Sequence, residues 1–178
     1  MLVKILLGVA IALVALFGII ALQPPEFRVV RSASIAAPPE RVFAAVNDFH
    51  QWKVWSPWEE LDPNMKRTFD GPTSGTGSRY GWSGNDDVGE GSMTILDSKP
   101  NELIRIKLEF IKPFASVADT EFVFKPEGGG TRVDWVMSGN NDFISKAFCL
   151  FMGGMDRMVG PDFEKGLSKM KSAAEAGG

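Results

Sequence analysis

The sequence predicts an α+β domain in which a long C-terminal helix lies across a curved antiparallel sheet, preceded by one N-terminal transmembrane helix. Three patterns predict this arrangement. An uninterrupted apolar run opens the chain, alternating polar and apolar residues dominate the part after Leu61, and apolar residues at helical spacing close it. The 178 residues are enough for one sizeable domain and too few for two comfortable ones.

The composition argues against several classes of protein. Lysine and arginine are scattered, and the net charge is -3, so we expect no nucleic-acid partner. The chain has one cysteine, Cys149, and one histidine, His50. Common zinc sites and cysteine–histidine catalytic pairs are hard to build from these, and a carboxylate-only metal site has no supporting spacing. We therefore expect no metal and no cofactor.

Residues 2–22 are expected to form a membrane anchor. Ile5 to Leu22 are eighteen residues without a charge, which as a helix span about 27 Å, close to the thickness of a bilayer core. The alternative is a cleaved signal peptide, whose apolar core is usually only about 7–15 residues. Pro24 and Pro25 follow the run directly, and no clean small-x-small cleavage site is present.

We expect a single-pass membrane protein whose soluble domain lies on the extracytoplasmic side. Lys4 and the amino terminus lie before the span, and Arg28 and Arg31 lie just past it, so the positive-inside rule nearly cancels. The tail of four residues before the span fits an N-inside arrangement. Residues 23–26 are expected to form a linker, stiffened by proline, and residues 27–175 the soluble domain.

The domain is expected to open with a strand and two short helices. Residues 27–36 alternate, as a half-buried strand does. The two prolines of "APPERVFAAVNDF" suit the first turn of a helix, and "HQWKVWSPW" predicts a second helix that stops at Pro57. Trp52, Trp55 and Trp58 lie three apart, which fits a core edge as well as a ligand-facing cluster.

Six further strands are expected over residues 65–69, 78–83, 91–96, 103–111, 120–125 and 131–137. The pattern is clearest at 103–111, where apolar and charged residues alternate strictly from Ile104 to Phe110. The turn "KPEGGGT" joins the last two strands as a hairpin. One-sided alternation with short turns predicts an antiparallel meander with one face in water.

Apolar residues at helical spacing from Ile144 to Ala174 predict the helix that covers the other face of the sheet. Gly153-Gly154 and Gly160-Pro161 are the points where this helix is expected to break or kink.

The stretch "YGWSGNDDVGEG", residues 80–91, groups acids and glycines as an active site or a tight turn would. It lacks the acid spacing of a calcium loop, and the nearby glycines do not lead into a helix as a phosphate loop does. A hairpin turn accounts for Gly84 to Asp87. With an even loop, Met93 shares the face of Tyr80 and Trp82, and Glu90 points to water. A β-bulge would reverse this register and bury Glu90.

The chain resembles the START and birch-pollen-allergen (SRPBCC) superfamily, and more closely its polyketide cyclase/dehydrase-like group. The resemblance rests on "RSASIAAPPERVFAAVNDFHQWKVWSPW", "GEGSMTI", "LEFIKPF", "GTRVDWVMSG" and "MVGPDFEKGLSKMK", in this order over residues 27–175. It implies a helix-grip fold, in which a bent seven-stranded sheet and the C-terminal helix enclose an apolar cavity. It supplies no catalytic residues, because the superfamily shares none.

We expect the inward faces of the sheet and helices to bind an apolar small molecule or lipid without catalysis. The expected ligand-binding residues are Trp58, Tyr80, Trp82, Met93, Phe110, Trp135, Met137, Phe151, Met155 and Phe163. The alternatives are a solid core, a polyketide cyclase/dehydrase- or hydrolase-like enzyme, and a protein-interaction or co-chaperone-like module. An enzyme needs a positioned acid or base, and the inward faces offer only Tyr80, Arg67 and, in the bulged register, Glu90.

Overall fold

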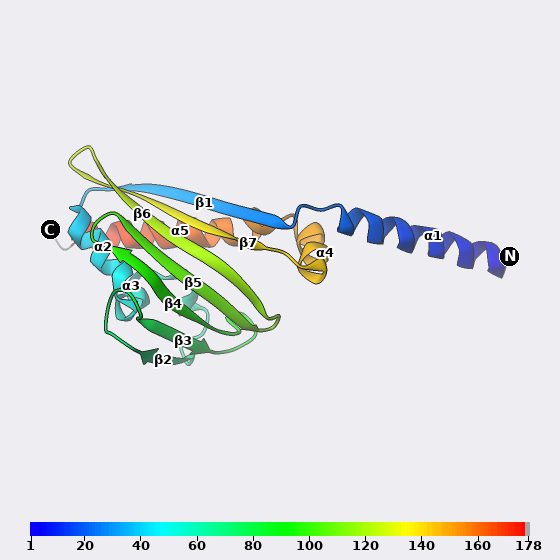
Figure 1. The fold of residues 1–178 in the computed structure, drawn as a ribbon, viewed down its shortest axis with the longest axis horizontal. Coiled ribbons are helices and arrows are strands. Elements are labelled where there is room, and N and C mark those ends of the chain that lie inside the picture. The colour runs from blue at the N-terminus through cyan, green and yellow to red at the C-terminus, as the bar shows by residue number, and fades with distance from the viewer. Residues whose placement is uncertain (177–178) are drawn as a thin grey trace.

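An antiparallel sheet and the helix packed across it make up most of the chain (Figure 1). The computed structural model describes residues 1–176. Its elements in chain order are α1 (Leu2–Ala21), β1 (Glu26–Ile35), α2 (Pro39–Asn47), η1 (Phe49–Gln51), α3 (Trp52–Trp55), η2 (Pro57–Glu60), β2 (Lys66–Asp70), β3 (Arg79–Ser83), β4 (Glu90–Lys99), β5 (Leu103–Lys112), β6 (Ser116–Glu127), β7 (Gly130–Asn140), α4 (Phe143–Met152) and α5 (Met155–Ala176).

The sheet has seven strands in the order β1-β7-β6-β5-β4-β3-β2. Strands β2 to β7 form the predicted meander, each antiparallel to the next, and β1 closes the series by pairing with β7. The alternating pattern of the sequence puts one side of each strand toward α5 and the other toward water. Together with the covering helix, this is the helix-grip fold, so the predicted fold class is confirmed.

A stack of aromatic rings joins the sheet to α5. The indole of Trp135 on β7 lies parallel to the ring of Phe163 on α5, with 4.0 Å between ring centroids. Its other neighbour is Phe122 on β6, at 4.8 Å. Gly166 allows this approach, because a Cβ atom there would lie 2.9 Å from the Trp135 ring.

The C-terminal helical region is two helices. Gly153 and Gly154, with φ of 84° and 94°, end α4, and α5 then runs through Gly160 and Pro161 without a break. Helix α4 contacts α1 and lies at the end of the sheet where α1 joins the domain (Figure 1). The predicted inward orientation of Phe151 was therefore wrong. The glycine break turns α4 away from the sheet, and the Phe151 side chain is exposed, as is that of Met152.

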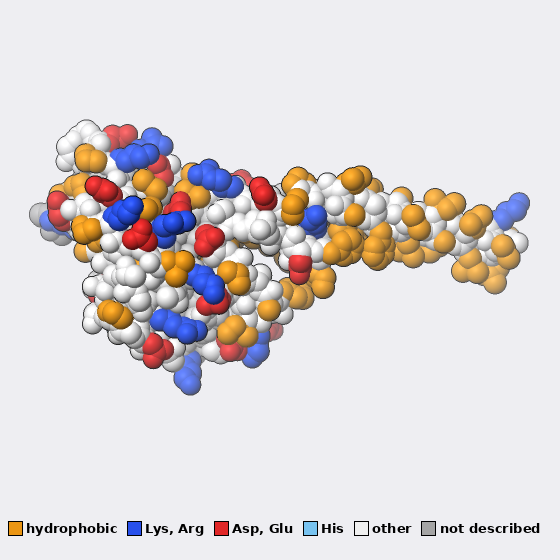
Figure 2. Space-filling view, viewed as in Figure 1, with side chains coloured by type: hydrophobic (Ala, Val, Ile, Leu, Met, Phe, Trp, Pro, Cys, Tyr) orange, Lys and Arg blue, Asp and Glu red, His pale blue; other side chains and the backbone are white. Residues whose placement is uncertain are grey.

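Helix α1 projects from the domain (Figure 1), and hydrophobic side chains cover it (Figure 2). Within residues 1–176, α1 alone is long and apolar enough to cross a membrane, with a mean hydropathy of 2.7. A signal sequence close to the N-terminus would have the same length and composition. Ile20 is its one buried residue.

Replacing Phe122 by alanine should lower the free energy of unfolding by about 3–5 kcal/mol, because the ring is fully buried against Trp135 and leaves a cavity. Leu96→Ala is the control, since Leu96 is half exposed on β4 and should change that free energy by about 0.5 kcal/mol or less. Denaturant titration of the full chain in detergent measures both. Equal effects would contradict the role given to the aromatic stack.

Candidate functional site

A cavity of about 260 Å³ lies between the sheet, the short helices and α5. It begins beside the aromatic stack, where the side chains of sheet and helix no longer meet. Its wall is mainly apolar, and the apolar lining residues are Trp52, Trp58, Met65, Tyr80, Trp82, Val88, Met93, Leu108, Phe110, Pro113, Trp135, Met137, Val159 and Phe163. The interior is therefore hollow on one side of the stack and solid on the other.

The structure brings eight of the ten expected ligand-binding residues to this cavity: Trp58, Tyr80, Trp82, Met93, Phe110, Trp135, Met137 and Phe163. Met155 lines a smaller cavity of about 160 Å³, which shares Phe110, Pro113 and Met137 with the larger one. Phe151 is 72% exposed on α4 and lines neither cavity. That these residues contact a ligand stays a prediction.

One corner of the cavity is polar. The Tyr80 hydroxyl donates a hydrogen bond of 2.8 Å to Glu59 Oε1, and Arg67 Nε donates one of 2.7 Å to Glu59 Oε2. Arg67 Nη1 also donates to the Met65 carbonyl. Burial, and then the bond to Glu59, raise the pKa of Tyr80 above its ordinary value, while Glu59 raises the pKa of Arg67. Tyr80 is therefore a neutral phenol at physiological pH.

Sequence reasoning missed Glu59, although it is the carboxylate closest to Tyr80 in the cavity. Glu59 lies in the 3-10 helix η2, whose three-residue turn sends adjacent side chains in different directions. Its neighbour Glu60 points instead to Lys165 and Lys169 of α5. Leu108 and Thr120 also line the cavity, and both share a predicted inward face with residues that were chosen.

The stretch 80–91 forms the predicted turn and also borders the cavity. Tyr80 pairs with Met93 and Trp82 with Gly91, which is the register expected for an even loop. Glu90 forms an ion pair with Lys112 at 2.8 Å and does not line the cavity. The loop itself lies against the cavity, and Trp82 Nε1 donates a hydrogen bond to the carbonyl of Val88. The loop residues that line the cavity are Asp86, Asp87, Val88 and Gly89.

Other candidate reactive groups lie away from the cavity or are engaged. His50 stacks on Phe69 and hydrogen-bonds to Asp48 at 2.7 Å, outside the lining. Within residues 1–176 no cluster of histidine, cysteine and carboxylate side chains could hold a metal ion. Within residues 1–176, the buried Trp135 Nε1 has no hydrogen-bond partner.

Several other proteins have solved structures with this fold. Protein CV1439 from Chromobacterium violaceum is 20% identical, with a TM-score of 0.56 over 85% of this chain and 99% of that one. An uncharacterized protein from Rhizobium leguminosarum is 19% identical, with a TM-score of 0.62 over 85% and 95%. The di-domain ARO/CYC StfQ from the steffimycin biosynthetic pathway is 10% identical, with a TM-score of 0.61 over 85% of this chain and 51% of that one.

At these identities the similarity establishes the fold alone. No curated protein matches the chain in sequence. Residues 26–175 match the family described as polyketide cyclase/dehydrase and lipid transport, which covers the whole sheet and nearly all of α5. The chain therefore belongs to this family, within the SRPBCC superfamily.

Proposed function

We propose that the domain binds an apolar small molecule or lipid in its internal cavity without transforming it, and that α1 holds the domain at a membrane. The observation that carries this proposal is the hollow beside Trp135, lined by aromatic and methionine side chains with one polar corner. Most ligand sites have this composition, an apolar wall with a few polar groups that orient the ligand. Methionine side chains adapt readily to ligands of different shape.

The energetics favour a largely apolar ligand. Burying about 400 Å² of apolar surface gains on the order of 10 kcal/mol at roughly 25 cal/mol per Å². Association costs roughly 4–15 kcal/mol, so a rigid apolar ligand at the low end of this cost binds without a charged anchor. The main cavity, of about 260 Å³, is close to the lower limit of about 300 Å³ typical of ligand pockets, and the cavity of about 160 Å³ shares three lining residues with it.

The polar groups fit a ligand with one oxygen-bearing end. The Tyr80 hydroxyl donates its own proton to Glu59, so its oxygen can accept a hydrogen bond from a ligand hydroxyl. An isolated carboxylate buried there would be unfavourable, and Arg67 offsets that cost by pairing with Glu59.

The second candidate function is a cyclase- or hydrolase-like enzyme, and Glu59 is the observation in its favour. A carboxylate inside an apolar cavity can act as a base if one of its oxygens is free. Glu59 accepts hydrogen bonds on both oxygens, from Tyr80 and Arg67. This arrangement suits a structural anion better than a proton acceptor, which is why we prefer binding.

Leu108→Trp should weaken ligand binding at least tenfold, because the larger side chain occupies the cavity. Leu108→Met, of similar volume, is the matched control and should bind as the wild type does. The probe is a dansylated fatty acid added to the delipidated full chain in detergent. Binding is followed by energy transfer from tryptophan, since Trp52, Trp58, Trp82 and Trp135 line the cavity.

Native mass spectrometry of the purified chain supplies an independent reading, and co-purified lipid is the expected result. The proposal fails if the wild type neither carries lipid nor binds the probe. Turnover of a thioester analogue that is lost in Glu59→Gln would instead favour the enzyme.

The titration of Tyr80 tests the polar corner directly, because Tyr80 is the only tyrosine in the chain. Phenolate absorbance should appear only above the ordinary midpoint of about 10. Glu59→Gln removes the negative charge and should lower the midpoint part of the way toward 10, since burial, the larger cause, remains. Glu60→Gln, which faces α5, should leave it unchanged.

The same pKa shift predicts how stability depends on pH. The unfolded chain releases the Tyr80 proton at about 10 and the folded chain at higher pH, so this contribution to the free energy of unfolding is intact below 10 and falls as the pH rises above it. Tyr80→Phe should remove that part of the alkaline loss. An ordinary midpoint in the wild type would contradict the buried hydrogen bond to Glu59.

The anchor proposal predicts that the chain purifies from membranes with α1 intact. The intact mass should include residues 1–22, and Ile11→Lys with Val14→Lys should release the protein from the membrane fraction. Protease added outside spheroplasts should digest the domain if it lies on the extracytoplasmic side. A mature chain that begins after Leu22 would instead identify α1 as a cleaved signal sequence.

A further inference from the structure

We propose that α4 and the β5–β6 turn form a membrane-contacting surface that seats the mouth of the cavity on the lipid bilayer. The proposal deepens the proposed function and depends on α1 being retained as an anchor. It concerns seven apolar side chains at the end of the domain nearest α1, here called the α4 patch. These are Ile111, Phe114, Val117, Ile144, Phe148, Phe151 and Met152, each 41–72% exposed.

The contact between α4 and α1 sets the depth of this patch. The ring of Phe143, at the start of α4, stacks on that of Phe17 in α1 with 5.4 Å between centroids. Phe17 lies four residues before Ala21, the last residue of α1, so it is about 6 Å inside the end of the helix at 1.5 Å per residue. Helices that lie in the membrane interface bury their apolar face by about 5–10 Å. If α1 spans the bilayer, α4 begins at interfacial depth.

The charges around α4 are consistent with this placement. Lys146 is the one charged side chain within α4, and its Nζ lies 3.5 Å from the carbonyl of Ala21, at the end of α1. Asp142 caps the helix through the backbone N–H of Ser145. Lysine side chains near the ends of spans commonly extend to the phosphate layer. Hydrophobic side chains continue from α1 onto α4 where the helices meet (Figure 2).

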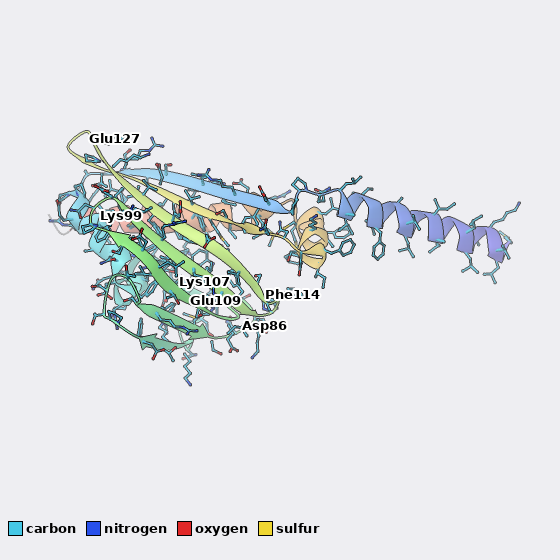
Figure 3. All side chains as sticks on the ribbon, in the orientation of Figure 1. Asp86, Lys99, Lys107, Glu109, Phe114 and Glu127 are labelled. Carbon is cyan, nitrogen blue, oxygen red and sulfur yellow. The ribbon has the colours of Figure 1, made fainter. Side chains whose placement is uncertain are left out.

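The patch extends to the β5–β6 turn, next to the cavity. The Phe114 ring lies 6.4 Å from that of Phe148, which ties the turn to α4. The smaller cavity lies beneath this contact and is lined by Phe114, Val117, Ile144 and Phe148. It shares Phe110, Pro113 and Met137 with the main cavity. Phe114, in the β5–β6 turn, and Asp86, in the loop that borders the main cavity, lie at the same end of the sheet (Figure 3).

A lipid bilayer fits this surface better than a second protein. The patch is continuous with a helix that is itself suited to a bilayer, and exposed apolar clusters on soluble domains mark protein or membrane contacts. The remote end of the sheet carries the charged residues Lys99 and Glu127 (Figure 3), whereas the α4 patch lies at the end beside α1. A ligand soluble in the bilayer would then meet the cavity where it opens.

Fluorescence quenching by lipid tests the proposal in the full chain. In a Cys149→Ser background, single cysteines replace Phe151, Phe114 or Leu96 and carry a bimane label. The chain is reconstituted in phosphatidylcholine vesicles with and without nitroxide-labelled lipid. We expect at least twofold quenching at positions 151 and 114 and none at 96, which is 51% exposed on β4. Position 151 lines neither cavity, so its label does not disturb the ligand site.

Binding of the dansylated fatty acid to the same labelled proteins separates this proposal from the proposed function and reports that they are folded. Quenching at 151 and 114 without fatty-acid binding would support the membrane surface and reject the ligand. Binding without quenching at either position would overturn the membrane surface and leave the ligand proposal standing. Mutual quenching of labels between protein copies, with no effect of nitroxide lipid, would also overturn it and identify a second copy on the patch.

Discussion

The stacking of Trp135 between Phe122 and Phe163 determines how the sheet and α5 are arranged. The rings of Trp135 and Phe163 are nearly parallel, at 7°, and Gly166 lets the helix approach the indole. Aromatic rings are rigid and large, so this contact fixes the spacing between the two layers over a short length. The layers diverge beyond it because the sheet is bent, and the side chains between them leave the space that forms the cavity. The same indole closes the core and forms part of the cavity wall.

The cavity keeps an ionic group where a packed hydrophobic group would stabilise the fold at least as well. The Glu59 side chain is only 10% exposed, and it holds both Arg67 and Tyr80. Buried ion pairs rarely add net stability, because desolvation cancels much of the attraction. The presence of the Glu59–Arg67 pair in an otherwise apolar wall fits a role in orienting a ligand. The cluster also ties η2 to β2 and β3, so the position of Tyr80 depends on the turn that follows the tryptophans.

Alternation and helical spacing predicted the sheet, its meander and the covering helix, because each reflects burial along a regular element. The alternation also predicted correctly that Tyr80, Met93 and Phe110 share the inward face of the sheet. Where regular spacing stops, the sequence was less informative. Gly153-Gly154 turns α4 away from the sheet, which helical spacing alone does not predict. Glu59 lies in a short 3-10 helix, so no regular pattern indicates that its side chain points inward. Whether inward side chains leave a hollow depends on their packed positions, which periodicity does not specify.

The two ends of the domain differ in the side chains that they expose. The end with the loop that borders the cavity is also the end that carries α1. The β6–β7 hairpin, far from α1, is flanked by ion pairs between Arg132, Asp134 and Lys125 (Figure 1). The opposite end combines the loop that borders the cavity, the β5–β6 turn and α4, and α1 leaves the domain there. Under the proposed function, a ligand that partitions into lipid would reach its site at the end of the domain that carries α1. One orientation of the domain would then serve both anchoring and access.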